Sequence, residues 1–276
     1  MPPTLERRYR ALSYGFRIVT DLPDVLDGID RLLAPFAVPE TGEGWPTFEI
    51  RAGGPARYEV SLDGAVCQRT DTSETLVEYM AWKASLEAIE TTDSYLVLHA
   101  GSVASEGRGL ILPAPPDSGK TTLTAALTLD GFDYLSDEAA LIEPDTGLLH
   151  PFPRALWMEA PSLDAVGIRS EVVDPDAERR AQYHVVPAQL RADAVGAPCR
   201  VRFVIFPSYR PGSTVALEPM SRAEAVIALA ENSFNLARFG ADGVRLVADV
   251  VRGADCYRLS MGNLDEAVRC LRATVG

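Results

Sequence analysis

Residues 110–122 read LILPAPPDSGKTT, an apolar run followed by a loop of small residues and prolines and then by Gly-Lys-Thr. The apolar positions Leu123, Ala126 and Leu127 follow with helical spacing. The stretch therefore has the order strand, loop, helix that a phosphate-binding loop requires. In such a loop the unpaired N–H groups of the helix N-terminus converge on one point, where the helix dipole adds positive charge.

A phosphate chain fits that point, and the residues around it are candidates for nucleotide binding. Lys120 would reach the β- and γ-phosphates as a mobile charge, and the hydroxyl of Thr121 is a hard oxygen ligand for Mg²⁺. The pattern is incomplete, because Ala114 replaces the usual first glycine and Asp117 places a carboxylate in the loop. The alternative is a Gly-Lys-Thr that only starts a helix. The predicted nucleotide-binding residues are Pro116, Asp117, Ser118, Gly119, Lys120, Thr121 and Thr122.

The composition is that of a globular chain with a proper core. The 276 residues, 47% of them hydrophobic, suffice for one large domain or two smaller ones. A net charge of -13 argues against nucleic acid as the main partner, because binding a phosphate backbone needs clustered Lys and Arg. The four cysteines lie far apart, which indicates reduced thiols and no zinc site.

Neither a targeting segment nor a membrane span is recognisable in the sequence. The charged residues 6–10 are not followed by an apolar segment, and no run approaches the length of a span. We therefore expect a cytoplasmic protein without a membrane partner. A homo-oligomer is compatible with this sequence, which leaves the oligomeric state open.

Residues 1–93 are predicted to form a small α+β unit. Alternation at 14–19, helical spacing at 22–33 and a hairpin over 48–62 are followed by a second helix. Thr75 and Glu78 predict a capping box for this helix, and Tyr79, Trp82, Leu86 and Ile89 predict a core-facing stripe. No chemistry is recognisable here, so we expect a packing unit or a substrate-selecting cap.

Residues 94–276 hold the candidate catalytic groups. His99 lies in the apolar run 95–104, where a histidine is typically a core residue. The strand predicted at 132–135 is followed by Asp137 and Glu138, and ligands gather at the carboxyl ends of strands in α/β sheets. One acid could hold Mg²⁺ while the other accepts a hydroxyl proton; an acidic turn is the alternative. Arg154 could clamp a phosphate or a carboxylate, or simply be exposed.

The rest of the chain is predicted to build scaffold. Its loop over residues 170–200 offers Arg180, His184 and Arg191 as weaker candidates for substrate contact. The expected strands lie at 201–207, 214–217, 244–251 and 257–260, and the helices begin after the caps Ser221 and Asn263.

Three segments together resemble the catalytic domain of HPr kinase/phosphorylase, and more closely the HPr-kinase-related kinases: LHAG at 98–101, SGKTT at 118–122 and YLSDE at 134–138. In that family a strand-borne histidine precedes the phosphate loop and an acid pair follows the next strand. The resemblance implies a mixed α/β fold with a P-loop-containing core like that of HPr kinase and the ATP-dependent phosphoenolpyruvate carboxykinases. Glu138 stands where the family has a second aspartate, and the glycine-rich signature that follows in true HPr enzymes is absent from the sequence.

The resemblance also implies site roles and cofactors. His99 and Asp137 would approach each other, with Asp137 as the base toward an acceptor hydroxyl, Lys120 on the phosphates of ATP, and Mg²⁺ held by Thr121, Asp137 and Glu138. The expected activity is Mg²⁺/ATP-dependent transfer of the γ-phosphoryl group to a peptide, protein or small molecule, HPr itself not being the expected substrate. The alternative is a nucleotide-binding regulator or peptide-binding accessory protein without phosphoryl transfer. The acceptor and the choice of ATP over GTP stay open.

Overall fold

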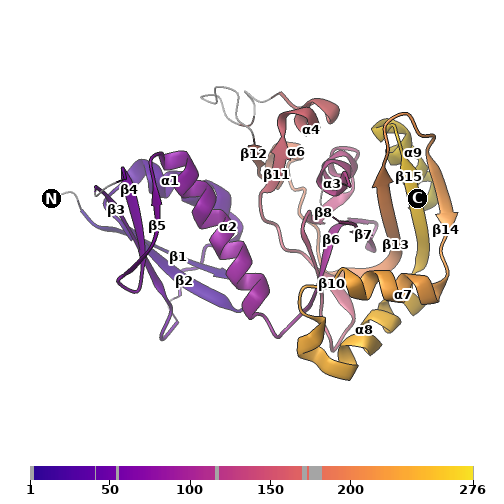
Figure 1. Ribbon diagram of the computed structural model, residues 1–276, viewed down its shortest axis with the longest axis horizontal. Helices are drawn as coiled ribbons and strands as arrows, with labels where there is room; N and C mark the ends of the chain where they lie inside the picture. Colours follow the sequence, from indigo (N-terminus) through magenta and orange to yellow (C-terminus); the bar gives the residue numbers. More distant parts are fainter. Residues whose placement is uncertain are drawn as a thin grey trace. The chain divides into compact units, whose positions relative to one another are not determined.

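The computed structural model describes residues 3–40, 42–53, 56–115, 118–169, 173 and 182–275. It is a mixed α+β structure that divides into two compact units, Met1–Asp93 and Ser94–Gly276 (Figure 1). Within these described ranges, no helix combines the length and the apolar character needed to cross a bilayer.

The first unit is a five-stranded sheet with two helices. The strands follow each other in chain order, and all neighbours are antiparallel except β2 and β3, which are parallel. Helix α1 makes the crossover between these two parallel strands. The elements are β1 (Leu5–Ala11), β2 (Tyr14–Thr20), α1 (Pro23–Leu33), a 3-10 turn (Ala34–Phe36), β3 (Thr47–Ala52), β4 (Tyr58–Leu62), β5 (Ala65–Thr70) and α2 (Ser73–Thr91).

Helix α2 begins earlier and faces differently than the sequence predicted. The cap is Thr72, whose hydroxyl accepts a hydrogen bond from the Thr75 N–H at 3.2 Å, so Thr75 lies inside the first turn. Trp82 of the predicted core stripe is exposed. The buried side of α2 carries many small residues because α1 packs closely against it; a Cβ on Gly28 would lie 2.9 Å from Val77 Cγ2.

The second unit is built on an eight-stranded sheet of order β10-β9-β6-β7-β13-β15-β14, with β8 also paired to β6. Strands β7, β13 and β15 are parallel, and the other strand pairs of this sheet within the described residues are antiparallel. The strands are β6 (Leu96–Ser105), β7 (Arg108–Pro113), β8 (Asp133–Ser136), β9 (Ala139–Ile142), β10 (Leu148–His150), β13 (Cys199–Tyr209), β14 (Ala216–Pro219) and β15 (Asp255–Met261). A separate ladder pairs β11 (Leu156–Glu159) with β12 (Gln182–Val185).

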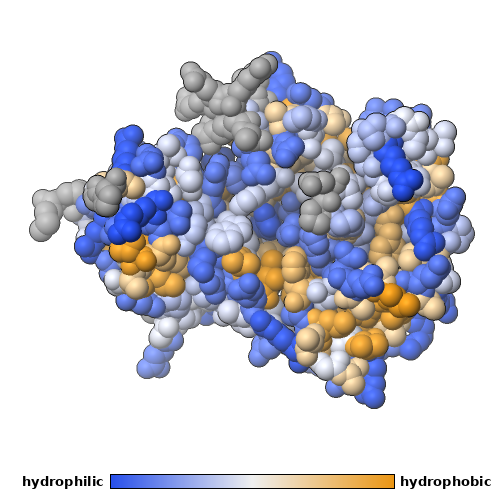
Figure 2. Space-filling model, in the orientation of Figure 1, coloured by the Kyte–Doolittle hydropathy of each residue, from blue (hydrophilic) through white to orange (hydrophobic). Residues whose placement is uncertain are grey.

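Helices cover both faces of this sheet. On one face α3 and α9 bury Leu123, Leu127 and Leu271 against β7 and β13. On the other face α7 and α8 bury Leu229 and Val247 against β6 and β7. Figure 2 shows hydrophobic side chains at the surface in the region of α7 and α8. The helices are α3 (Lys120–Leu129), α4 (Ala160–Ala165), α6 (Pro187–Leu190), α7 (Arg222–Glu231), a 3-10 turn (Leu236–Phe239), α8 (Gly240–Arg252) and α9 (Leu264–Val275).

The strand predicted at 244–251 is wrong, because these residues belong to α8. Val247, Val250 and Val251 are buried with the spacing of one helix face, whereas Val244 is exposed. The valine content favoured a strand, but the spacing of the buried valines is helical. The caps predicted for α7 and α9 are confirmed by hydrogen bonds from the Glu224 N–H to Ser221 and from the Glu266 N–H to Asn263.

Candidate functional site

The predicted site residues of the second unit meet at one edge of its sheet. Strand β6 runs antiparallel to β7 with Ala100 opposite Pro113, so His99 lies just beyond the end of β7. Strand β8 ends at Ser136, opposite Ser102 of β6, and delivers Asp137 and Glu138 to the same region. This is the carboxyl edge of the parallel strands, where ligands of α/β sheets gather.

Helix α3 begins at this edge on a glycine. Gly119 is its N-cap with φ +83°, a conformation that side chains rarely adopt, and a Cβ there would lie 3.1 Å from Met261 Cε. The Ser118 hydroxyl donates a hydrogen bond to the Pro115 carbonyl at 2.6 Å. The first N–H groups of α3 therefore face the loop end with no side chain at the cap. The predicted binding residues Pro116 and Asp117 lie outside the described residues.

A second glycine lets α3 approach β6. A Cβ on Gly101 would overlap the hydroxyl of Thr124 and lie 3.2 Å from Lys120 Cγ. The Thr124 hydroxyl donates back to the Lys120 carbonyl at 2.9 Å, which fixes the first turn of the helix. Gly101 thus brings the stem of Lys120 against the strand that carries His99.

Lys120 is buried, with 6% of its side chain exposed, and its ammonium group meets two partners. Nζ lies 2.6 Å from His99 Nε2 and 4.0 Å from Glu138 Oε2. His99 Nε2 also lies 3.2 Å from Glu138 Oε1. A single ring nitrogen cannot accept from Lys120 and donate to Glu138 at once, so the three groups form one proton-sharing cluster.

The pKa values of Lys120 and Glu138 follow from burial and mutual attraction. Burial lowers the pKa of Lys120 below its usual value, although Glu138 and Asp137 act against the shift. Burial acts to raise the pKa of Glu138, but the hydrogen bond with His99 and the charge of Lys120 outweigh it and lower that pKa. Glu138 is therefore held as a carboxylate.

Asp137 has a different set of partners. It is buried, and its Oδ2 accepts a hydrogen bond from the Thr121 hydroxyl at 3.4 Å. Its Oδ1 accepts from the Tyr134 hydroxyl at 3.2 Å and lies 3.9 Å from Arg154 Nε. Burial raises the pKa of Asp137 despite the opposing charge of Arg154. Asp137 is thus a desolvated carboxyl beside the start of α3.

The two consecutive acids point to different partners because Ser136 turns the chain between β8 and β9. Its hydroxyl accepts hydrogen bonds from the N–H groups of Glu138 at 3.3 Å and Ala139 at 3.1 Å. The resemblance implied that Asp137 would lie beside His99; the carboxylate found in contact with His99 is Glu138. Neighbouring residues in a turn project in different directions, so Glu138 contacts His99 while Asp137 contacts Thr121 and Tyr134.

Arg154 and Thr122 complete the set of predicted residues. The Arg154 guanidinium lies 5.4 Å from the centre of the Trp157 ring, and its carbonyl accepts a hydrogen bond from Tyr134 at 3.1 Å, so Arg154 belongs to the surroundings of Asp137. The Thr122 hydroxyl donates instead to Ser162 of α4 at 3.1 Å.

Two of the weaker candidates from the loop over residues 170–200 are described, and their contacts lie outside the cluster of Lys120, His99 and Glu138. The His184 ring packs edge-on against Trp157, and Arg191 pairs with Asp133 at 2.9 Å. Arg180 falls outside the part of the chain that the structure describes.

Thr121 and Asp137 fit a magnesium ion that is shared with phosphates. Within the described residues, no three His, Cys, Asp or Glu side chains are arranged to hold a metal by themselves. Mg²⁺ needs fewer protein ligands, because one or two carboxylates with water and substrate phosphates complete its shell. The Thr121 hydroxyl and the Asp137 carboxylate, 3.4 Å apart, are oxygen ligands of this kind, whereas Glu138 is engaged by His99.

Some site residues were missed by sequence reasoning. The His99 N–H donates to the Asn232 carbonyl at 2.6 Å, and the His99 ring lies 5.1 Å from that of Phe234, which is half exposed. The Asn235 side chain holds this segment by accepting from the Val97 N–H at 2.9 Å. The asparagines that bracket residues 232–235 are the available sequence signal, but local spacing does not reveal that β6 lies beside them.

Comparison with known proteins yields a loose structural likeness. No family model matches the chain, and no curated protein matches it. A solved structure of the HPr(Ser) kinase/phosphatase from Coxiella burnetii matches with 13% sequence identity and a TM-score of 0.34, over 64% of this chain and 91% of that chain. Because this likeness is low, the chemistry has to be derived from the residues of this chain.

Proposed function

We propose that the protein is a Mg²⁺/ATP-dependent kinase that transfers a γ-phosphoryl group to a hydroxyl of a peptide, protein or small molecule. The observation that carries this proposal is the cluster at the start of α3, where buried Lys120 meets His99 and Glu138 beside the desolvated carboxyl of Asp137. Residues 94–276 would then be an HPr-kinase-like nucleotide-binding catalytic domain, and residues 1–93 an accessory unit. Phosphoryl transfer relies mainly on positioning and charge neutralisation, which such a cluster can supply.

The phosphates are the natural ligand of the α3 N-terminus. The N–H groups of its first turn and the helix dipole attract an anion, and Gly119 places no side chain at the cap. Lys120 shares its charge with His99 and Glu138. A triphosphate offers it stronger anionic partners, and His99 then retains Glu138 as its hydrogen-bond partner.

Asp137 is the candidate base. A carboxyl whose pKa is raised by burial accepts a proton more readily than an exposed one, which suits it to take the proton of an acceptor hydroxyl. The Tyr134 hydroxyl and Arg154 orient it. A magnesium ion held by the Thr121 hydroxyl and the phosphate oxygens would neutralise charge on the phosphates and leave Asp137 to accept the proton.

A nucleotide-binding regulator without phosphoryl transfer is the second candidate. It is favoured by the pairing of Lys120 with His99 and Glu138, which satisfies the lysine without any phosphate, and by Ala114 and Asp117 in the loop. In this case the proton-sharing cluster would respond to nucleotide binding, and no acceptor hydroxyl would be needed.

The test measures ATP binding and ADP production by the full chain, with and without Mg²⁺, together with a mass-spectrometric search for phosphate on candidate acceptors. The kinase proposal expects Mg²⁺-dependent binding, slow ADP production from ATP alone and faster production with a true acceptor. Asp137→Asn should retain binding and lose ADP production, whereas Lys120→Ala should lose both.

Binding without ADP production or phosphorylated acceptor would favour the regulator, and absence of ATP binding would exclude both. An Asp137→Asn variant that still makes ADP would overturn the base assignment.

A further inference from the structure

An exposed aromatic residue stands beside the start of α3. Phe203 and Ile205 of β13 are buried in the cluster that packs against α3 and α9. Side chains of a strand alternate between faces, so Tyr209, at the end of β13, points to the same face. Its exposed fraction is 50%, unlike that of the buried residues before it.

Tyr209 is close to the cap of α3. A Cβ built on Gly119 would lie 3.5 Å from Tyr209 Cβ, so the two backbones approach each other with almost no side chain between them. Tyr209 is opposite Met261 in the register of β13 and β15, and the Met261 methyl lies 3.1 Å from the same point. The ring of Tyr209 therefore starts beside the N-cap of α3.

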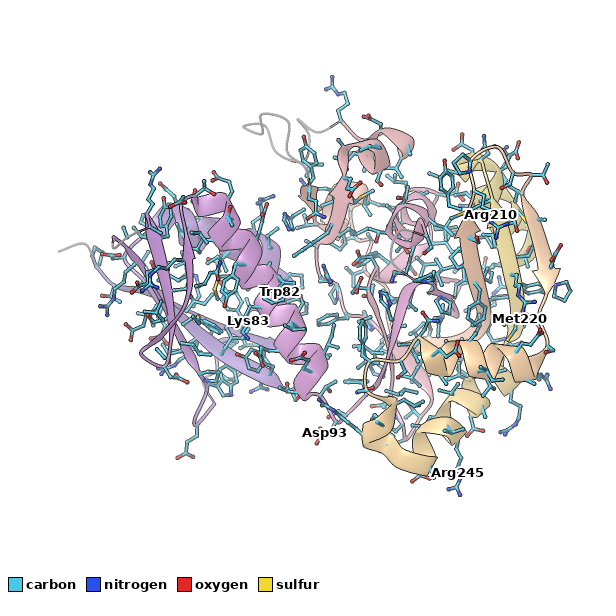
Figure 3. All side chains as sticks on the ribbon, in the orientation of Figure 1. Trp82, Lys83, Asp93, Arg210, Met220 and Arg245 are labelled. Carbon is cyan, nitrogen blue, oxygen red and sulfur yellow. The ribbon has the colours of Figure 1, made fainter. Side chains whose placement is uncertain are left out.

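The backbone that carries Tyr209 is held firmly. The Arg210 N–H donates to the Met261 carbonyl at 2.9 Å, and the Ser213 N–H donates to the Arg210 carbonyl at 3.1 Å (Figure 3 labels Arg210). A Cβ on Gly262 would overlap the backbone of Ser213, so this turn sits tightly on the end of β15. A ring that is carried on a well-held backbone and keeps half its surface exposed can receive a flat ligand with little ordering of the chain.

We propose that Tyr209 is the platform on which the purine base of the nucleotide stacks. This inference rests on the proposed function, since it assumes that the phosphates lie at the N-terminus of α3. An aromatic ring binds a base through its face, and loss of such a ring weakens base binding substantially. A purine presents a larger face than a pyrimidine and gains more from the same platform.

The experiment compares two ligands of the full chain, ATP and inorganic tripolyphosphate, each with Mg²⁺ and measured by calorimetry. Tripolyphosphate keeps the phosphates and lacks the base. Tyr209→Ala should weaken ATP binding about tenfold, equivalent to about 1.4 kcal/mol, and leave tripolyphosphate binding within about twofold. Tyr209→Phe should bind both like the unmodified chain. The matched control is Ile227→Ala, which removes an exposed apolar side chain from α7 on the opposite face of the sheet and should change neither affinity.

The outcomes separate this inference from the function on which it rests. Equal weakening of both ligands by Tyr209→Ala would show that the residue shapes the loop, and no weakening of either would show that the base lies elsewhere; each overturns the platform. Tripolyphosphate binding as tight as ATP binding would also overturn it while leaving the phosphate site intact. If the unmodified chain bound neither ligand, the proposed function itself would fail. A preference for ATP over UTP that shrinks in Tyr209→Ala would support the purine assignment.

Discussion

The sequence contains two lysines, one in each unit. They differ in how far they are buried and in the partners they meet. Lys83 lies on α2 with 22% of its side chain exposed and pairs with Glu87 one turn later at 2.5 Å. Lys120 has 6% exposed and meets a histidine and a glutamate from two other segments. The first arrangement is an ordinary helix pair of small effect. The second desolvates a charge, which is weak evidence for stability and stronger evidence for a functional site.

The same contrast holds for the other buried polar groups. In the described part of the first unit, the buried polar side chains are all hydroxyls: Thr20, Thr70, Ser85 and Thr92. The second unit buries the ionisable groups of Lys120 and Asp137 close to each other, and it also buries His184 on β12. The buried lysine and aspartate, which folding does not require, therefore lie together at one sheet edge of the second unit.

The largest expected effect comes from removing each lysine in turn. Lys120→Met should lower the rate of ADP production by about 100-fold or more, because the transferred phosphate loses a preorganised charge. Its melting temperature should stay level or rise, since a desolvated ammonium group disappears. Lys83→Met, the matched control, should keep the rate and change the free energy of unfolding by no more than about 0.5 kcal/mol. An equal loss of the rate of ADP production in both variants would contradict the difference inferred between the two lysines.

Asp137→Asn tests whether the buried charge of Asp137 serves activity while it lowers the stability of the fold. Burial raises its pKa in the folded state above the ordinary value of 3.8, so the folded chain binds a proton more tightly than the unfolded chain. The contribution of Asp137 to stability therefore falls as pH rises from about 4 through the folded-state pKa. Asn carries no such charge.

Urea denaturation between pH 4 and pH 8 measures this effect. Near neutral pH, Asp137→Asn should gain about 1 kcal/mol of unfolding free energy relative to the unmodified chain, while ADP production falls about 100-fold. The gain should shrink as the pH is lowered toward 4. A variant that is less stable than the parent at neutral pH would show that Arg154, Thr121 and Tyr134 need the charge, which would make Asp137 a structural partner.

Substituting either of two closely packed glycines should have a smaller effect, and only the substitution in the second unit should change ATP binding. Gly101→Ala places a methyl group against Thr124 and Lys120, and Gly28→Ala places one against Val77. Both should lose about 1–3 kcal/mol of unfolding free energy through overpacking. Only Gly101→Ala should also weaken ATP binding, because α3 and Lys120 must shift away from β6. Equal ATP affinity in the two variants would mean that the position of α3 does not matter for the site.

The sequence predicts those parts of the structure that depend on residues close together in the chain. The order β7, loop, α3 follows from one continuous pattern, and the helix starts at Lys120, within the Gly-Lys-Thr that precedes the predicted helical positions. The acids after β8 follow from a similar pattern. The contact of Glu138 with His99 was not predicted, since it depends on a turn that Ser136 makes with the backbone.

Local sequence patterns could not predict the contacts between segments that are distant in the chain. Asn232 and Phe234 reach His99 only because the segment after α7 returns to β6. Tyr209 reaches Gly119 only because β13 lies next to β7 in the sheet. The exposed Trp82 was misplaced for a related reason, since the packing of α1 on α2 selects small residues at the contact.

The smallest expected effect concerns two buried tyrosines with the same kind of partner. Tyr134 donates to Asp137 in the second unit, and Tyr9 donates to Asp30 in the first. Replacing either with Phe should lower the free energy of unfolding by about 1 kcal/mol, the typical contribution of such a hydrogen bond. Only Tyr134→Phe should reduce the rate of ADP production, by a few-fold at saturating ATP, since Asp137 loses an orienting partner and keeps Thr121 and Arg154. If Tyr9→Phe slowed ADP production as much as Tyr134→Phe, the loss would have to come from general destabilisation, and the hydroxyl of Tyr134 would have no part in positioning the base.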